Sequence, residues 1–575
     1  YNPVAQPVSD IIEIDNQLAK ATNKRAVYNE KGSLVPSQLI SSGNGKAKLL
    51  VAASAPPCGY VVYDIRTGGN KASSNLKVSE NTIENSIYKV TLDKNGDISS
   101  IIDKRNQKEL VESGKAIRLA LFTENESFNW PAWEILKKEM DKAPISITDG
   151  VKISVVEEGP VRATIGVERR YNESVFKQYI RLNEGGQNDR IDLLTEIDWQ
   201  TTNALLKAEF PLTVSNSVAT YDLGIGAIER GTNTEIAYEV YAQQWADLTD
   251  KNQSYGVSIL NDCKYGWDKP NDNTLRLTLL HTPKTKGGYR YQDKQDFGHH
   301  MLTYSIVGHS GTYRDAKTVL KAEVLNQPMK AFVTQKNAGV ASKSFSFLTI
   351  DNDRVAIKAL KQAENSDEYI IRLYETTGKD SQNAAISFAD EIISAKELNG
   401  VEDEIANASF NNNKLNIAIN PFGIKTYKVR LKSPKTNVSP SISTPLALKY
   451  NMKTSSFNAF RNDANFDGKG NSFAAELLPK EIDMKGIKFK LESGDKPNGL
   501  KCKGDTIDLP SGQYNKIYFL ATSAQHNNKV AFLIDGKPQE AVIPYYTGFI
   551  GQWGHTGHTE GFLKAADIAY IGTHM

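Results

Sequence analysis

The stretch NSIYKVTLDKNGDISSII, residues 85–102, decides the fold class. Ile87 and Val90–Leu92 form an alternating apolar run, and Ile98–Ile102 form a second. Between them, Asp93–Asp97 contains Asn-Gly, the dipeptide that best fits a tight turn between antiparallel strands. The stretch therefore predicts a β-hairpin.

The same period-two alternation recurs along the chain, most clearly between Val161 and Trp199 and again in NKLNIAINPFGIKTYKVRL, residues 413–431. In EIDWQ, alternation places Ile197 and Trp199 on one strand face and the acidic residues on the other. Helical periodicity is rare: 315–327 is a candidate helix, and 383–398 fits either a helix or strands. Many short strands separated by turns predict an all-β protein built of β-sandwiches.

Composition excludes several classes of partner. The 575 residues contain 69 Lys+Arg and 67 Asp+Glu, so bulk charge favours neither nucleic acid nor a membrane surface. No apolar run reaches the roughly 18 residues of a membrane span. The N-terminus lacks the pattern of a signal peptide and does not begin with Met, so we expect a processed chain or one cut from something longer.

Changes in composition predict the domain boundaries. Gly/Ser/Asn-rich and Pro-rich runs suggest a small β-sandwich over 1–72, a large block over 73–330 and a further β-sandwich over 331–432. KSPKTNVSPSISTP, 432–445, is the clearest linker, and we take 433–445 as its extent. Residues 446–575 form a last β-sandwich module, which we expect to be cut short because the chain stops just after an apolar strand.

The usual catalytic signatures are missing from the sequence, which has neither HExxH nor a phosphate-binding glycine loop. His299, His300 and His309 lie on alternating segments and are candidate bases or ligands. WGHTGHTEG, 553–561, contains His555 and His558 three residues apart. Its glycines favour a loop, and no third ligand can be named, so we expect no catalytic metal there.

The last module offers two further candidates. Asp463, Asn465 and Asp467 match the first positions of a calcium-binding loop, but the terminal Glu of that loop is absent. Tyr545, Tyr546 and Trp553 are candidate rings for stacking on the apolar faces of sugars.

Longer segments of the sequence say more about its family than these short spacings do. In one consistent order, the chain has TIENSIYKVTLDKNGDISSIIDKRNQKEL, LTEIDWQTTNALLKAEFPL, QQWADLTDKNQSYGVSILNDCKYGW, DFGHHMLTYSIVGHSG and NPFGIKTYKVRL. Together they resemble the C-terminal β region of glycoside hydrolase family 38, the class II α-mannosidases of bacterial type. The resemblance covers roughly residues 1–432 and implies that 73–330 is a galactose-mutarotase-like super-β-sandwich.

The resemblance also implies that the catalytic residues of the family lie outside the region that this chain resembles. In this family an N-terminal α/β barrel holds zinc or another divalent ion and supplies the nucleophilic Asp. The sequence has no H-x-D-x-x-W motif, so no catalytic or metal-binding residue transfers to it. We expect a chain that is inactive alone, needs no cofactor of its own, and partners the catalytic barrel and a mannoside glycan.

Two regions are expected to contact glycan. NESFNWPAWEI, 125–135, occupies the place of a sandwich loop directed at substrate, which makes Trp130, Trp133 and Glu134 contact candidates. Residues 446–575 resemble an accessory jelly-roll module of bacterial sugar hydrolases.

Three hypotheses follow. The chain is the folding and substrate-shaping region of a retaining α-mannosidase, a stand-alone carbohydrate-binding protein, or a lyase or epimerase that uses the large sandwich and a histidine base. A periplasmic or extracellular location is favoured for the parent protein.

Overall fold

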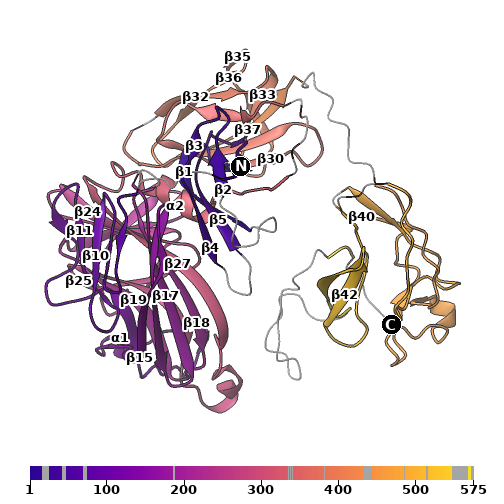
Figure 1. Ribbon diagram of the computed structural model, residues 1–575, viewed down its shortest axis with the longest axis horizontal. Coiled ribbons are helices and arrows are strands. Elements are labelled where there is room, and N and C mark those ends of the chain that lie inside the picture. The colour runs from indigo at the N-terminus through magenta and orange to yellow at the C-terminus, as the bar shows by residue number, and fades with distance from the viewer. Residues whose placement is uncertain are drawn as a thin grey trace. The chain divides into compact units, whose positions relative to one another are not determined.

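The computed structural model forms two compact units, Tyr1–Lys435 and Thr436–Met575 (Figure 1). The structure describes residues 1–15, 25–41, 47–68, 74–185, 188–334, 336, 339, 341–380, 382–432, 443–484, 486–512, 514, 516–546 and 568–570. The described residues are predominantly strands, which confirms the all-β prediction.

The hairpin predicted at 85–102 is present as β10 (Tyr88–Leu92) and β11 (Ile98–Asp103). The Asp93 carboxylate stabilises the turn by accepting hydrogen bonds from the backbone N–H groups of Asn95 and Asp97, at 2.8 and 3.0 Å. Gly96 has φ +77, and a Cβ there would lie 2.4 Å from Val167. Glycine is therefore required both by the backbone conformation and by close packing.

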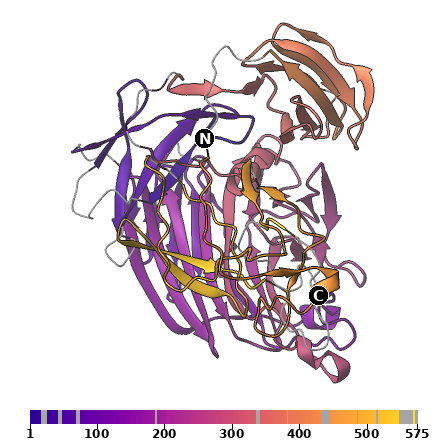
Figure 2. The same cartoon turned by 90° about the vertical axis from the view of Figure 1, so that its right-hand side faces the viewer.

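The hairpin belongs to a large two-layer sandwich (Figures 1 and 2). One layer is a nine-stranded antiparallel sheet, in the order β15 (Asp149–Glu158), β16 (Arg162–Tyr171), β17 (Ser174–Asn183), β18 (Ile191–Trp199), β27 (Gly298–Ser310), β24 (Tyr255–Asn261), β23 (Trp245–Thr249), β20 (Val218–Asp222) and β21 (Ala227–Gly231).

Two sheets make up the facing layer. The first has the order β12 (Lys108–Glu109), β11, β10, β9 (Thr82–Glu84) and β8 (Lys77–Val78). The second has the order β14 (Ile145–Ser146), β13 (Arg118–Phe122), β19 (Ala204–Pro211), β26 (Thr274–Thr282), β25 (Gly266–Asn271) and β22 (Val240–Tyr241). Mutual backbone hydrogen bonds between Ile98 and Ile117, at 3.0 and 2.9 Å, join the two sheets.

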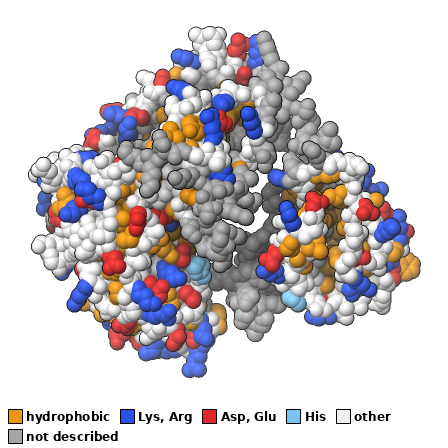
Figure 3. All heavy atoms as spheres, in the orientation of Figure 1, with side chains coloured by type: hydrophobic (Ala, Val, Ile, Leu, Met, Phe, Trp, Pro, Cys, Tyr) orange, Lys and Arg blue, Asp and Glu red, His pale blue; other side chains and the backbone are white. Residues whose placement is uncertain are grey.

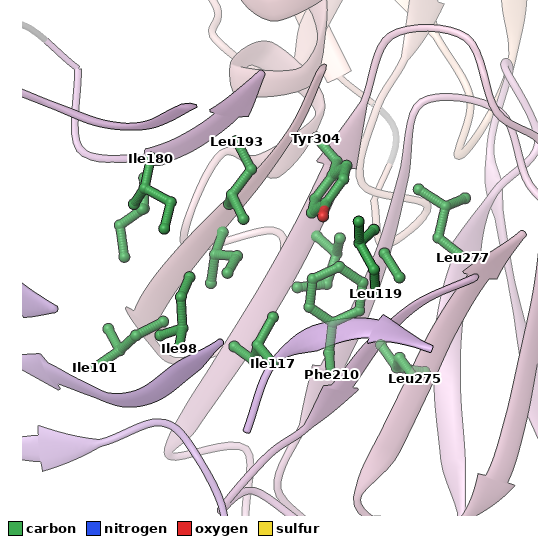
Figure 4. Close-up of a cluster of buried hydrophobic side chains, with 14 of the residues drawn as sticks. Ile98, Ile101, Ile117, Leu119, Ile180, Leu193, Phe210, Leu275, Leu277 and Tyr304 are labelled. Atoms are coloured by element: carbon green, nitrogen blue, oxygen red, sulfur yellow. The ribbon is translucent and has the colours of Figure 1, made fainter. Parts of the chain in front are cut away.

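The core lies between these layers. Figure 4 shows Ile180, Leu193 and Tyr304 from the nine-stranded sheet pointing toward side chains of the facing layer such as Ile98 and Phe210. All are at most 2% exposed. Burial of this apolar surface is the main force that holds the sandwich together.

Strand β18 shows how the sequence pattern becomes packing. Ile197 and Trp199 are fully buried, whereas Glu196 is half-buried and Asp198 is exposed, as alternation predicts. The Trp199 indole N–H donates to Thr282 Oγ1 at 2.8 Å, so its single polar group is satisfied inside the core.

The N-terminal strands form two three-stranded sheets. The first has the order β1 (Val8–Asp15), β5 (Ala47–Ala55) and β4 (Ser37–Ser41), and the second has the order β3 (Leu34–Val35), β2 (Arg25–Tyr28) and β7 (Asp64–Thr67). Ion pairs of β1 tie the first of these sheets to the large sandwich. Arg190 bridges Asp10 of β1, at 3.1 Å, and Asp192 of β18, at 2.7 Å. Arg162 similarly pairs with Glu13 and Glu157.

The N-terminal segment also contributes to the last sandwich of this unit. β6 (Gly59–Val61) pairs antiparallel with β28 (Ser344–Ser346), and Ala5 and Cys58 belong to the same apolar cluster as residues 348–429. The N-terminal strands thus have an apolar cluster of their own, which includes Val27 and Leu49, and also contribute to the core of the last sandwich.

The last sandwich of this unit has two sheets. One has the order β29 (Leu348–Ile350), β32 (Gln382–Phe388), β36 (Lys414–Ile419) and β35 (Phe410–Asn411). The other has the order β30 (Val355–Gln362), β31 (Tyr369–Glu375), β37 (Ile424–Leu431), β33 (Ile392–Leu398) and β34 (Glu404–Asn407). The helix predicted at 315–327 is α2 (Thr318–Asn326). Residues 383–398 form β32 and β33, so the helical alternative is wrong there.

Helix α2 contacts the last sandwich through a buried polar pair. The Tyr374 hydroxyl of β31 donates to Glu323 Oε1 of α2 at 3.2 Å, and both side chains are less than one-tenth exposed. Burial raises the pKa of Glu323 to about 7, partly opposed by the Tyr374 hydrogen bond.

In the second unit, the described residues form three short strand pairs: β38 (Ser455–Ser456) with β39 (Phe473–Ala474), β40 (Glu481–Met484) with β41 (Ile487–Lys490), and β42 (Asn528–Ile534) with β43 (Lys537–Ile543). A single 3-10 turn, η2 (Asn458–Phe460), is described there. The linker predicted at 433–445 lies largely outside the described residues.

Figure 3 shows acidic and basic side chains interspersed over the visible face. This matches the near-equal numbers of the two charge types in the sequence. Among the described residues, no helix is long and apolar enough to span a membrane.

Candidate functional site

The candidate site is the tryptophan loop, residues 125–135, which follows β13 and leads into the short helix α1 (Lys137–Met140). Trp130 is 54% exposed and Trp133 is 75% exposed. Their rings stack on each other, with centroids 5.6 Å apart and planes within 8°. Two exposed, mutually stacked indoles form a flat apolar surface of the kind that sugar rings or a protein partner can cover.

A tight turn brings the two indoles together. The backbone N–H groups of Trp133 and Glu134 both donate to the Trp130 carbonyl, at 2.8 and 3.0 Å. Oε1 of Glu134 accepts from Ser127 Oγ at 2.8 Å and from the Trp130 backbone N–H at 3.4 Å. The Glu134 carboxylate therefore helps to close the loop, in addition to any role as a hydroxyl acceptor.

The loop is anchored at Pro131, the buried residue between the two indoles. Its carbonyl oxygen lies 3.1 Å from Nε2 of His281 and accepts from Nε2 of Gln295 at 3.0 Å. His281 belongs to β26, and Gln295 lies in the segment between the 3-10 helix η1 (Gly287–Gln292) and β27. Two segments distant in sequence thus hold one carbonyl.

The surroundings of His281 define its hydrogen-bonding state. Its Nδ1 lies 3.0 Å from Nδ2 of Asn125, a donor that also bonds the Ala204 carbonyl at 2.9 Å. Because an amide NH₂ donates and a carbonyl accepts, Nδ1 must be the acceptor and Nε2 must carry the proton toward Pro131. Burial lowers the pKa of His281, which favours this neutral form.

His281 and Gln295 could not be found from the sequence. Their contacts to Pro131 join positions 150 and 164 residues apart, and neither residue lies in a motif. The only sign of this anchor in the local sequence was the presence of polar residues beside the apolar run of β26.

The three histidines proposed as bases do not come together. His299 and His300 lie at the start of β27 and His309 near its end, about 30 Å away along an extended strand. Nε2 of His300 contacts the Asp296 carbonyl at 2.6 Å. His309 is buried, with Nε2 2.7 Å from Asp247 Oδ2.

A second polar feature, unrecognised in the sequence, occupies the outer face of the six-stranded sheet. Lys207 and Arg276 both pair with Asp268, and all three side chains are at most 4% exposed. Glu209 joins Arg276 to Arg118, whose Nε donates to Glu209 Oε1 at 2.8 Å. An open groove of about 990 Å³ passes over Arg118, Glu209 and Arg276.

This arrangement does not resemble an acid–base pair for glycoside hydrolysis, which requires two carboxylates facing a shared substrate bond. Asp268 and Glu209 instead accept from cations of the sheet itself. The signal for the cluster was a charged residue at alternate positions of otherwise apolar strands, as in LLKAEF and LRLTLL.

The calcium candidates are engaged by the protein itself. Asp467 accepts from the backbone N–H groups of Lys469 and Asn471, from the Asn471 amide and from the Tyr546 hydroxyl. Asp463 pairs with Lys453, and Asn465 accepts from the Gly470 N–H. Across the described ranges, no three His, Cys, Asp or Glu side chains form a group that could hold a metal ion.

The aromatic candidates of the second unit differ in position. Tyr546 packs edge-on against Phe466 and Phe473, at centroid distances of 5.0 and 6.0 Å, in a half-buried aromatic cluster. Tyr545 lies edge-on to Tyr546 at 5.1 Å. Trp553, His555 and His558 lie outside the described residues.

Comparison with known families matches three segments. Residues 83–288 match the glycosyl hydrolases family 38 C-terminal domain, and 354–427 match the family 38 C-terminal beta sandwich domain. Residues 442–575 match the AziU2-like beta-sandwich domain.

Individual proteins agree. Alpha-mannosidase G of Dictyostelium discoideum is 27% identical over 419 residues, which is 66% of this chain and 36% of that protein. Human alpha-mannosidase 2C1 is 26% identical over 365 residues, covering 61% and 34%. The chain thus spans about a third of the length of the curated relatives it matches.

Solved structures show the same fold. A glycosyl hydrolase family 38 protein from Enterococcus faecalis has a TM-score of 0.60 at 16% identity, covering 75% of this chain and 57% of that chain. An alpha-mannosidase from E. faecalis V583 has a TM-score of 0.59 at 15% identity, covering 75% and 55%.

The two β-sandwiches of the first unit have the fold of the E. faecalis family 38 structures. The family matches are more specific, because two family 38 domains match in order over the two sandwiches. The chain therefore resembles the C-terminal half of family 38 glycosyl hydrolases, with matches to two C-terminal domains of that family, followed by an additional β-sandwich domain.

Proposed function

We propose that this chain is the non-catalytic β region of a retaining α-mannosidase that acts on α-mannosides of glycans. The observation that carries the proposal is the ordered pair of family 38 C-terminal domains in a chain whose relatives are named α-mannosidases. The nucleophile and the zinc or other divalent ion belong to the catalytic barrel of the parent protein. This region supports the folding of that barrel and shapes the substrate site.

The tryptophan loop is the contact surface of this region. Trp130 and Trp133 present their rings to the apolar face of a mannose unit, and Glu134 lies beside them as a hydroxyl acceptor. Leaving two indoles this exposed is unfavourable unless a partner or ligand covers them. The buried Pro131 anchor supports the proposal because it keeps this apolar surface facing outward.

The second unit is proposed to hold a glycan near the enzyme, with Tyr545 and Trp553 as ring contacts and with Tyr546 supporting Tyr545 through its edge-on contact. Each contact in a shallow sugar site is modest, so the dissociation constant should be roughly 0.1–1 mM. Titration calorimetry of the chain with mannose-rich glycans tests this, using the Tyr545→Ala variant. Equal heats from the variant and the parent would remove Tyr545 from the site.

The central test uses the pure chain and an aryl α-mannoside. Without nucleophile, acid/base group and metal, the rate should be indistinguishable from background, because losing such a set lowers turnover by many orders of magnitude. The matched control is the same chain joined to a family 38 barrel. Zinc-dependent turnover by the chain alone, abolished by a chelator, would refute the proposal.

A further inference from the structure

The tryptophan loop is held differently from an ordinary exposed turn. Its two indoles lie on the surface, but the carbonyl between them is fixed by side chains from two other segments. Gln295 is itself tied in place, because its Nε2 also donates to the His281 carbonyl at 3.0 Å and its own carbonyl accepts from Thr282 Oγ1 at 2.6 Å. The anchor is therefore a connected network.

The network continues into the core. The Thr282 hydroxyl that bonds Gln295 also accepts from the buried Trp199 indole. On the other side, fully buried Asn125 connects His281 to the Ala204 carbonyl. These hydrogen bonds thus fix the position of Pro131 relative to strands of the large sandwich, and the two indoles on either side of Pro131 are held with it.

We propose that His281, in its neutral form with the proton on Nε2, is the positioning residue that holds Trp130 and Trp133 as a preformed stacking platform. This rests on the proposed function only for the identity of the ligand, a mannoside. A platform fixed before binding loses little conformational freedom when the sugar arrives, whereas a loose one must be ordered first. Loss of the anchor should therefore weaken mannoside binding about tenfold.

The tautomer matters because each ring nitrogen has a different partner. Protonation of His281 would put N–H groups on both nitrogens, and Nδ1 would then face the Asn125 amide donor. The charged groups near the ring are Asp296, whose carboxylate accepts the His281 backbone N–H, and Lys207 on β19; the backbone of Glu134 also faces the ring. Only the histidine ring itself normally titrates between pH 5 and 8.

The experiment uses the full chain labelled with 5-fluorotryptophan and one-dimensional ¹⁹F NMR. The Trp130→Phe and Trp133→Phe variants assign the two loop resonances among the six tryptophans. His281→Asn keeps an acceptor for Asn125 but loses the donor to Pro131, and His281→Gln keeps the donor. The matched control is His526→Ala, which removes an exposed histidine of the second unit.

The Trp130 and Trp133 resonances should shift and change width in His281→Asn, recover toward the parent in His281→Gln, and stay unchanged in His526→Ala. In the parent, but not in His281→Gln, they should also move as the pH falls below the usual range of histidine titration. Unchanged loop resonances in His281→Asn would overturn the proposal. If that variant fails to fold, Gln295→Ala removes the other donor and must give the same loss of order.

A separate set of spectra is recorded with added methyl α-mannoside, both for this chain alone and for the chain joined to its barrel. A shift of the loop resonances with sugar, about tenfold weaker in His281→Asn, is the expected result. Resonances that respond to His281→Asn but never to sugar would refute the mannoside contact and leave the anchor standing. Resonances that respond to sugar but not to His281→Asn would refute the anchor alone.

Discussion

The buried carboxyl of Glu323 gives a prediction with a worked magnitude. Its pKa rises from 4.5 to about 7 because helix α2 buries it against the last sandwich. At 1.36 kcal/mol per pH unit, holding it ionised in the folded state costs about 3 kcal/mol. In Glu323→Gln the amide keeps an acceptor for the Tyr374 hydroxyl, 3.2 Å away, but carries no charge at any pH.

The sign follows from proton linkage. Between pH 4.5 and about 7 the folded chain binds this proton more tightly than the unfolded chain does, so stability falls as the pH rises. Below pH 4.5 the carboxyl is protonated in both states and the penalty disappears. Glu323→Gln should therefore be nearly neutral at low pH and stabilising by about 3 kcal/mol at pH 8.

Differential scanning calorimetry of the parent chain and the variant at pH 5 and pH 8 measures the effect. The Tm of the Glu323→Gln chain should exceed that of the parent by a few degrees at pH 8 and by much less at pH 5. Glu364→Gln, at an exposed position, is the control. A variant that is less stable than the parent at pH 8, or a gain that does not grow with pH, would refute the reasoning.

Two further predictions concern other parts of the chain. Arg190→Ala leaves the carboxylates of Asp10 and Asp192 without their cation and should destabilise the first unit by about 3–5 kcal/mol in calorimetry. The control, Arg66→Ala at an exposed position, should cost less than about 1 kcal/mol, and equal losses from the two variants would contradict the prediction. Tyr546→Phe removes the hydroxyl 3.0 Å from Asp467 and should lower the stability of the second unit by about 1 kcal/mol in urea unfolding, leaving the transition of the first unit in place.

Local patterns predicted much of the fold. The hairpin at 85–102, the buried face of Ile197 and Trp199, and the helix near 315–327 all depend on neighbours within a few residues. Residues 383–398 remained ambiguous because a short apolar run fits both periodicities, and only their pairing partners decide for strands.

The candidate site was predictable only in part. Trp130 and Trp133 stand out because large aromatic residues beside a proline in a polar segment are uncommon on a surface. Their anchor was not predictable, since His281 and Gln295 contact Pro131 across about 150 residues of sequence. Tyr546 was proposed as a sugar contact from its residue type alone, and its packing against Phe466 joins positions about 80 residues apart in the sequence.

The pairing of β6 with β28 has a consequence for synthesis on the ribosome. Gly59 pairs with Ser346 and Val61 with Ser344, so the edge of β6 has its partner only after residue 346 has emerged. At about 5–20 residues per second, that delay is on the order of tens of seconds. During this interval the nascent chain displays an unpaired strand edge, which is the kind of surface that can pair with another chain.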